Sequence, residues 1–505
     1  MLKSSAVLYA LLSAVAWSQQ QPAIPPSLTI YNQNFAVVRE IVPLRLKPGA
    51  NPVSFDNITS YVEPSSVMLR DPAERVHLSI LEQNYRSDAV SQYILLHSFE
   101  GKTIAFAVRR GDHEETVNGK VIRAGMVCLP GTNDANGVYC NGNNDAQFEQ
   151  TPIIEVDGTL RFGLPGTPLF PSLGEGALLK PALNWLLQSD KAAQFNAELS
   201  YVTGGLTWEA TYNIIVPEKG DALDLIGWVT LQNHSGRTFE NARLQLMAGD
   251  VNKIVTPGPP MSGVGGGYGG GVDRAALQRP QVTEAALDEY HLYTLQRPST
   301  LLNGEAKQVE FLRAAGIPSK RVYLYEGYAL DVARYGGSNW EYLSQQPEIG
   351  LTTNKRVYVM REFRNSQADH LGMPLPKGRM RFYRRDDEGR LQFVGENKIE
   401  HTPKDETLRV YTGDAFDIIA ERRRTEFKTD GMRQWMDESY EIKLRNHKKE
   451  AVEVQVVEHM YRGDNWVISA SSAEYTKKKS HTAEFTAKLP PDGEQTITYS
   501  VHYTW

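Results

Sequence analysis

Apolar and polar side chains alternate along most of the chain, with the period of two that is typical of β-strands with one buried face. Asn-Gly and Asp-Gly pairs, which favour tight turns, separate many of these alternating runs. The sequence therefore predicts a mainly β protein, made of several successive β-sandwich (Ig-like) domains with few short helices. Hairpins are predicted at residues 153–162, 379–394 and 485–505.

Helical patterns are few. Residues 88–97 could form a helix capped at Asp88 or the residue before it, and residues 283–290 could form another. Residues 177–187 have apolar residues at alternate positions, as in a strand, and Pro181 disfavours a helix interior. The pattern of this third stretch allows either a strand or a helix.

A loose recurrence links three strand-like segments that end in asparagine: residues 229–233, 362–365 and 442–446. Polar turn residues and a second strand-like run follow each of them. Their spacing is irregular, which excludes a solenoid of fixed period. We interpret the recurrence as repeated use of a sandwich hairpin in successive β domains.

The N-terminus carries one positive charge, then a short apolar stretch and small residues, as in a secretory signal peptide. We expect residues 1–18 to be a signal peptide that is cleaved between Ser18 and Gln19. Cleavage before Trp17 is one alternative, and an uncleaved signal anchor or buried first helix is another. Export would place the protein in the periplasm or on the outer surface of a bacterium.

The length of 505 residues allows about three domains. We expect an N-terminal β-rich region with a short helix and a Cys–Cys loop over residues 19–198. A central β domain is expected over residues 199–395 and a C-terminal β-sandwich domain over residues 396–505. The net charge of −6 is too small to indicate a nucleic-acid partner. After residue 18, no apolar run is long enough for a transmembrane helix.

Residues 255–282 differ from the rest of the central domain, because they contain eight glycines and few large apolar residues. Such a stretch cannot bury enough apolar surface to offset its ordering entropy. We predict a disordered insertion that is dispensable for folding. The strand-like residues 242–247 and 290–295 on its two sides could still pair across it.

The chain has only two cysteines, Cys128 and Cys140, in a segment rich in turn-forming residues. In an exported protein this arrangement favours a disulfide between them. Closing so short a loop would stabilise the fold by roughly 3 kcal/mol. A metal site is the weaker alternative, because no CxxC occurs and the nearest histidine is His113.

Common catalytic and ligand-binding motifs are absent or incomplete. The phosphate-loop fragment at residues 101–103 lacks its first glycine, and the glycine-rich run lacks the flanking strand and helix of a dinucleotide site. Neither GxSxG nor HExxH occurs. We therefore predict no catalytic residue, no cofactor site and no metal site.

Two groups of arginines are expected on solvated strand edges and faces, where charge also discourages edge-to-edge pairing. The tripeptide at residues 462–464 matches a cell-adhesion sequence, but three residues are too few to be specific. The first group is Arg422, Arg423 and Arg424, and the second is Arg379, Arg381, Arg384 and Arg385.

Residues 199–208 (LSYVTGGLTW) resemble the core motif of an uncharacterised bacterial family, the domain of unknown function 4139. The resemblance implies export and a β-rich architecture, and it supplies no agreed activity or catalytic residue. The same domain type is distantly similar to part of the mucoidy-inhibitor proteins, whose long coiled coil this sequence lacks. Further similar segments are residues 30–39, 227–233, 244–252, 289–295, 413–417 and 444–447.

These features favour an exported structural or binding protein of the cell envelope that is not an enzyme. Its partner would be an envelope protein or a polysaccharide, and the many tyrosines and tryptophans would allow sugar stacking. One alternative is an exported hydrolase whose carboxylate or metal site is dispersed in sequence. A second is an outer-membrane β-barrel, because residues 499–505 alternate and end in an aromatic residue.

Overall fold

The computed structural model describes residues 24–86, 92–111, 113–125, 151–173, 178–217, 220–253, 282–328, 346–351, 353–430 and 434–505. The signal peptide with Ser18 and Gln19, the Cys128 and Cys140 pair, and residues 255–281 of the insertion lie outside these ranges. The structure is 65% strand and 3% helix, so the predicted mainly β class is confirmed. None of the helices in the described ranges has the length and apolarity needed to span a bilayer.

The first large sheet of the chain has eight strands, in the order β16-β17-β15-β1-β2-β12-β4, with β18 paired to β15. Strand β1 lies parallel to β15, although more than two hundred residues separate them. Strands β15 and β17 pair directly, as predicted for the two sides of the insertion. The strands are β1 (Ser27–Tyr31), β2 (Phe35–Leu46), β4 (Met68–Arg70), β12 (Ala193–Gly204), β15 (Phe239–Ala248), β16 (Val282–Leu287), β17 (Tyr290–Leu295) and β18 (Ser299–Leu301).

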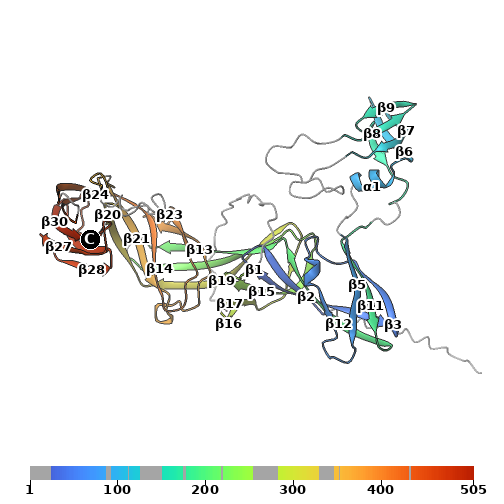
Figure 1. Cartoon of the computed structure of the whole chain (residues 1–505), viewed down its shortest axis with the longest axis horizontal. Helices are drawn as coiled ribbons and strands as arrows, with labels where there is room; N and C mark the ends of the chain where they lie inside the picture. The colour runs from blue at the N-terminus through green and yellow to red at the C-terminus, as the bar shows by residue number, and fades with distance from the viewer. Residues whose placement is uncertain are drawn as a thin grey trace, which may run out of the picture.

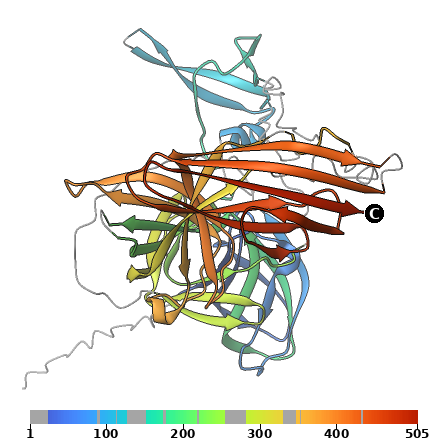
Figure 2. The same cartoon turned by 90° about the vertical axis from the view of Figure 1, so that its left-hand side faces the viewer.

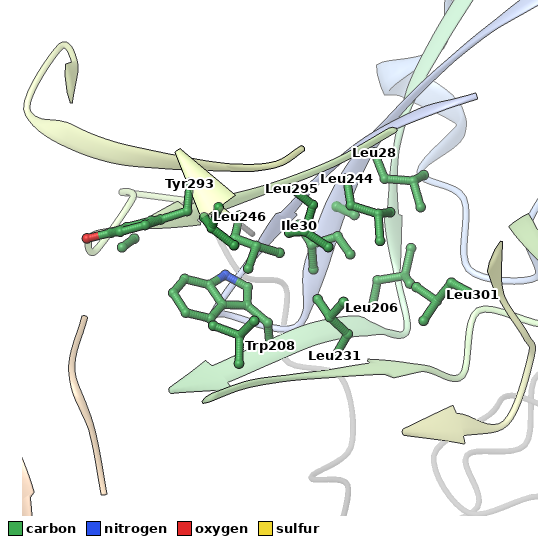
Figure 3. Close-up of a cluster of buried hydrophobic side chains, with 14 of the residues drawn as sticks. Leu28, Ile30, Leu206, Trp208, Leu231, Leu244, Leu246, Tyr293, Leu295 and Leu301 are labelled. Atoms are coloured by element: carbon green, nitrogen blue, oxygen red, sulfur yellow. The ribbon is translucent and has the colours of Figure 1, made fainter. Parts of the chain in front are cut away.

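A five-stranded sheet, in the order β19-β14-β13-β22-β23, packs against the eight-stranded sheet. Figure 3 shows leucines of β1 and β15 facing Leu206, Trp208 and Leu231 of β13 and β14. Trp208 is 3% exposed, as expected for a side chain between two sheets. The strands are β13 (Leu206–Val216), β14 (Leu223–Asn233), β19 (Glu305–Ile317), β22 (Gly378–Arg385) and β23 (Leu391–Ile399).

A three-stranded sheet in the order β3-β11-β5 contributes Leu183, Trp185 and Leu187 to the same core. These side chains alternate on β11, so the ambiguous stretch is a strand in its second half. The strands are β3 (Gly49–Phe55), β5 (Leu78–Arg86) and β11 (Ala182–Ser189). Two short 3-10 turns, η1 (Pro64–Ser66) and η3 (Gln367–Asp369), complete the central region.

The C-terminal part is a sheet of nine strands around a second core, in the order β27-β30-β25-β24-β21-β20-β26-β29-β28. Its later strands, from β24 to β30, are the orange-red and red ribbons of Figure 2. They are β20 (Ser319–Glu326), β21 (Arg356–Arg364), β24 (Thr407–Thr429), β25 (Trp435–Asn446), β26 (Val452–His459), β27 (Trp466–Ser471), β28 (Tyr475–Lys479), β29 (Thr482–Leu489) and β30 (Glu494–Thr504).

A third core belongs to a small unit that stands apart from the sandwiches in Figures 1 and 2. Helix α1 (Gln92–Ser98) packs its Leu96 against Phe106 and Ile154 of a sheet in the order β10-β6-β7-β8-β9. The described part of the first predicted helix is therefore confirmed. The strands are β6 (Thr103–Arg110), β7 (His113–Arg123), β8 (Ile153–Val156), β9 (Thr159–Phe162) and β10 (Thr167–Leu169).

Two of the three predicted hairpins form and the third does not. Strands β8 and β9 pair across the Asp157-Gly158 turn, and β22 pairs with β23. Strand β29 instead pairs with β26 and β28, and β30 with β25 and β27. The turn between β29 and β30 therefore does not join two paired strands. It connects two strands whose pairing partners all come from earlier in the chain.

The helix predicted at residues 283–290 is wrong. Strands β16 and β17 form a hairpin there, and Asp288 takes a positive φ of 55° in the turn. The local helix formers Glu284, Ala285 and Ala286 are overridden because β17 offers an unpaired edge.

The recurrent asparagines are real structural equivalents, but the segments that follow them are not hairpins. Asn233, Asn365 and Asn446 are each at most 1% exposed. Strands β14 and β15, and likewise β25 and β26, belong to different pairings, so the chain arches from one layer to the other. The division of the chain at residues 198/199 and 395/396 stays a prediction.

Candidate functional site: a pocket between two cores

Strands β21 and β24 pass from the central core to the C-terminal core. Phe363 of β21 and Val410 of β24 belong to the central core, whereas Val357 of β21 and Ile418 of β24 belong to the C-terminal core. The paired strands must therefore change the face that they bury part of the way along. A strand can do this by accepting extra residues on one side of the ladder.

The extra residues lie in β24. Tyr358 faces Asp414 and Arg356 faces Ile419, so the single residue Val357 lies opposite residues 415–418. A second register shift separates Val359 from Met360. This bulge coincides with residues 413–417 (GDAFD), one of the segments that resemble the family.

The bulge presents Phe416 to solvent, where it is 95% exposed. Leaving a phenylalanine in water forgoes about 2 kcal/mol of burial free energy, so a partner that covers it would recover that energy. Nearby, β23 and β24 come into close contact because position 395 is a glycine. A Cβ at Gly395 would clash with the carbonyl oxygen of Thr412.

A pocket of about 380 Å³ lies where these strands meet, and we call it the junction pocket. Cationic side chains and apolar or aromatic side chains share its lining. Figure 1 labels β21 and β23, two of the strands that contribute lining residues. The lining residues used below are Arg321, Arg361, Arg384, Lys448, Tyr323, Val394, Asp414, Phe416 and Asp417.

Arg361 is the most deeply placed cation of the pocket, since its side chain is 6% exposed. Burial lowers the pKa of its guanidinium, and the charges of Arg321 and Arg384 lower it further, against the effect of Asp221. Asp221 accepts a hydrogen bond of 2.6 Å from Arg361 and is itself 44% exposed. Three arginines therefore lie close together in the pocket, and the carboxylate that pairs with Arg361 is itself partly exposed.

The Tyr323 hydroxyl accepts hydrogen bonds from two further cations. Arg321 donates to it over 3.2 Å, and Lys448 over 2.7 Å. Glu450 lies 3.7 Å from Arg321 and 3.5 Å from Lys448, but it is 64% exposed and so is only a weak counter-ion. Tyr323 thus fixes two positive charges in the lining of the pocket.

Two carboxylates of the bulge also line the pocket. Asp414 accepts a hydrogen bond of 2.9 Å from the Tyr411 hydroxyl and lies 3.5 Å from Arg356. Asp417 fixes the end of the bulge through its carbonyl oxygen, which accepts a hydrogen bond from the His447 amide. The pocket therefore suits a ligand that combines a carboxylate or phosphate with an apolar group, because arginine forks bind such anions and Phe416 offers a free ring face.

Motif searching missed this site, since its cations come from strands that are distant in sequence. Arg384 was expected on a solvated surface with Arg379, Arg381 and Arg385, yet it lines the pocket. Arg379 and Arg381 do lie on an open face, 3.6 Å and 3.3 Å from Glu396. The signal that could have located the site is the GDAFD segment, whose phenylalanine interrupts the alternation of β24.

The expectation that Arg422 and Arg424 are solvated is wrong. Arg422 is 1% exposed and pairs with Glu458, and Arg424 is 11% exposed and pairs with Glu438. Only Arg423, between them, is exposed, at 71%. Two carboxylates inside the C-terminal core require buried cations, which composition alone does not reveal.

The tripeptide at residues 462–464 is not presented as a cell-adhesion sequence. Arg462 is buried and lies 2.7 Å from Glu438, so its guanidinium cannot reach a receptor. Among the described residues, no cluster of histidine, cysteine, aspartate and glutamate has a geometry that could hold a metal ion.

Comparison with known proteins gives one family and no characterised relative. No curated protein matches the chain. The family described as a domain of unknown function (DUF4139) matches residues 197–505, which is more than half of the sequence. This match includes every residue that lines the junction pocket. The chain therefore belongs to the DUF4139 family.

Proposed function

We propose that this chain is an exported, non-enzymatic binding protein of the bacterial cell envelope, and that the junction pocket holds an anionic group of its partner. The signal-peptide pattern of residues 1–18 supports export. The β-sandwich cores supply a rigid frame on which a binding site can be presented.

One observation carries the assignment of the site. Phe416 is almost fully exposed on a bulge of its strand, beside four cationic side chains that converge from four separate segments. Bulges of this kind re-aim side chains and are common beside functional sites. An exposed aromatic ring beside a charged pocket is typical of a recognition surface.

The chemistry of the lining supports binding rather than catalysis. Arginine holds its proton at every physiological pH, so Arg321, Arg361 and Arg384 can orient an anion but cannot exchange protons with it. The Asp414 carboxylate is already engaged by Arg356 and by the Tyr411 hydroxyl. Such groups recognise charge and shape.

The test is Phe416→Ala in the mature chain, with Phe162→Ala as the matched control. Phe162 is 78% exposed, on β9 of the separate small unit, and lies outside the family match. Both substitutions should leave the unfolding midpoint within error, because neither ring is buried.

In a pull-down from a bacterial envelope extract, Phe416→Ala should retain at least fivefold less of the captured component, and Phe162→Ala should retain the wild-type amount. Raising the salt concentration should weaken capture further, since the pocket is cationic. Equal retention by the two variants would remove the junction pocket from the function.

A further inference from the structure

Strand β23 forms one edge of the central five-stranded sheet, and it begins with exposed apolar side chains. Leu391, Phe393 and Val394 are 43%, 56% and 44% exposed. Within the described ranges of the chain, no strand pairs with the outer side of β23. An apolar edge without a partner is a template for another strand.

The backbone of this edge has N–H and C=O groups that do not bond to β22 and could pair with an added strand. The Asp386 amide donates to the carbonyl oxygen of Arg390 over 2.9 Å, which makes these two residues a hydrogen-bonded pair of the hairpin. Two positions further along the ladder, Arg384 faces Gln392. In an antiparallel ladder, bonded and non-bonded pairs alternate. The N–H and C=O groups of Leu391 and Phe393 therefore point away from β22, toward the open edge.

Natural sheets normally protect such edges with charge. Strand β19, the opposite edge of the same sheet, does so with Lys307, Glu310 and Arg313. Residues 391–394 of β23 (LQFV) carry no charge and no proline. The charges of β23 lie further along, at Glu396 and Lys398, so the uncharged part of the edge is confined to residues 391–394.

The open edge leads into the junction pocket. Val394 lines the pocket directly after the exposed residues. At the next position, Gly395 lies against Thr412 of β24, which closes the edge. A strand docked on residues 391–394 must therefore end beside Phe416 and the pocket cations.

We propose that an extended, acidic segment of a partner protein adds a strand to β23 at residues 391–394 and places a carboxylate in the junction pocket. This inference rests on the proposed function, because it uses the same pocket and names the chemistry of its partner. Main-chain hydrogen bonds to Leu391 and Phe393 would supply affinity, and the pocket would select the acidic residue.

Charge complementarity favours this occupant over a neutral strand. Four cationic side chains line the pocket, against the carboxylates of Asp414 and Asp417. The further counter-ions Asp221 and Glu450 are 44% and 64% exposed, so they neutralise the cations that they contact only weakly. The free backbone groups favour a peptide over a saccharide, because a sugar ring offers no ladder of alternating donors and acceptors at strand spacing.

The probe is a fluorescently labelled peptide of alternating threonine and valine that ends in two glutamates, titrated against the mature chain. A version ending in two glutamines should bind at least tenfold more weakly. A version N-methylated at alternate amides should also lose at least tenfold, because it cannot pair with β23. This version tests strand addition without altering the protein.

The protein variants are Leu391→Pro and Lys448→Gln. Leu391→Pro should weaken the glutamate peptide at least tenfold, because it removes an outward N–H. Leu160→Pro, on the edge strand β9 of the small unit, is the control and should bind as wild type. Lys448→Gln should weaken the glutamate peptide and leave the glutamine peptide unchanged.

Three results would overturn the inference. One is equal binding of the N-methylated and unmodified peptides. Another is displacement by an oligouronate with no peptide binding, in which case the pocket takes a saccharide and the proposed function stands. The third is loss of self-association in Leu391→Pro on sedimentation, which would make the occupant a second copy. The proposed function itself fails separately, if Phe416→Ala retains the envelope component normally.

Discussion

Arg422 and Glu458 form an ion pair in which both side chains are 1% exposed. The Arg422 Nε atom lies 3.1 Å and 2.9 Å from the two carboxylate oxygens. The guanidinium also donates to the carbonyl oxygen of Gly350 and lies 3.7 Å from the centre of the Tyr440 ring. Tyr499 donates to Glu458. Every charge here has partners, which is the condition for keeping ions in an apolar core.

A second group of charges, one glutamate with two arginines, lies in the same core and is linked to the first by tyrosines. Glu438 accepts from Arg462 over 2.7 Å and from Arg424 over 3.0 Å. The hydroxyls of Tyr440 and Tyr461 lie 2.9 Å apart. Burial raises the pKa of Tyr440 and the charge of Glu438 raises it further, so this hydroxyl stays protonated.

Glu458→Gln should lower the free energy of unfolding by about 3–5 kcal/mol, because it leaves the Arg422 charge buried without a counter-ion. Chemical denaturation measures the change. Glu441→Gln breaks the neighbouring exposed pair with Arg423 and should cost less than about 1 kcal/mol. If the two substitutions cost the same, the buried pair does not have the structural role assigned to it.

At the scale of elements, three asparagines stabilise the ends of strands where the chain crosses between layers. Asn446 donates from Nδ2 to the carbonyl oxygens of Glu450 and Pro490, both over 2.9 Å, and its Oδ1 accepts from the Lys448 amide. Asn233 and Asn365 also donate to two carbonyl oxygens each and accept an amide. Backbone groups in an arch have no neighbouring strand to bond to, and the asparagine side chain takes the place of that strand.

Asn446→Ala should therefore lower the free energy of unfolding by about 1–3 kcal/mol, because it removes three hydrogen bonds made by a side chain that is 1% exposed. Asn446→Asp should be at least as damaging, since a carboxylate cannot donate to Glu450 and Pro490. Thermal and urea unfolding measure both. The exposed Asn57 is the control, and a substitution there should change stability by less than about 0.5 kcal/mol. A neutral Asn446→Ala would show that water replaces the side chain.

At the scale of the whole molecule, the small unit is inserted between two paired strands. Arg86 at the end of β5 faces Ala182 at the start of β11. Helix α1 and the strands between them have a core of their own, around Leu96, Phe106 and Ile154. The insertion therefore leaves and rejoins the central sandwich at one place.

Replacing residues 87–181 with a two-residue Asn-Gly turn should convert β5 and β11 into a simple hairpin. The shortened chain should unfold cooperatively, with a midpoint within a few degrees of the full chain, and should bind the acidic peptide equally well. Calorimetry and the peptide titration test this. Loss of the cooperative transition would mean that the small unit supports the central core.

The local hydrophobic pattern determined much of this architecture. The mainly β class, the hairpins at 153–162 and 379–394, the described part of α1 and the family resemblance all followed from the sequence. Each depends on residues that are neighbours in the chain. The pairing of β15 with β17 was also predictable, because a glycine-rich insertion adds closure entropy only slowly.

Only the tertiary structure decided which strands pair over long distances and what those pairings bury. The partners of β29 and β30, the strand at 283–290, the burial of Arg422 and the cations of the junction pocket all depend on contacts between distant segments. Alternation shows that a strand has an apolar face, but it does not name the strand that covers it. The bulge at Phe416 exists because β21 and β24 serve two cores, and that constraint appears only when both cores are assembled.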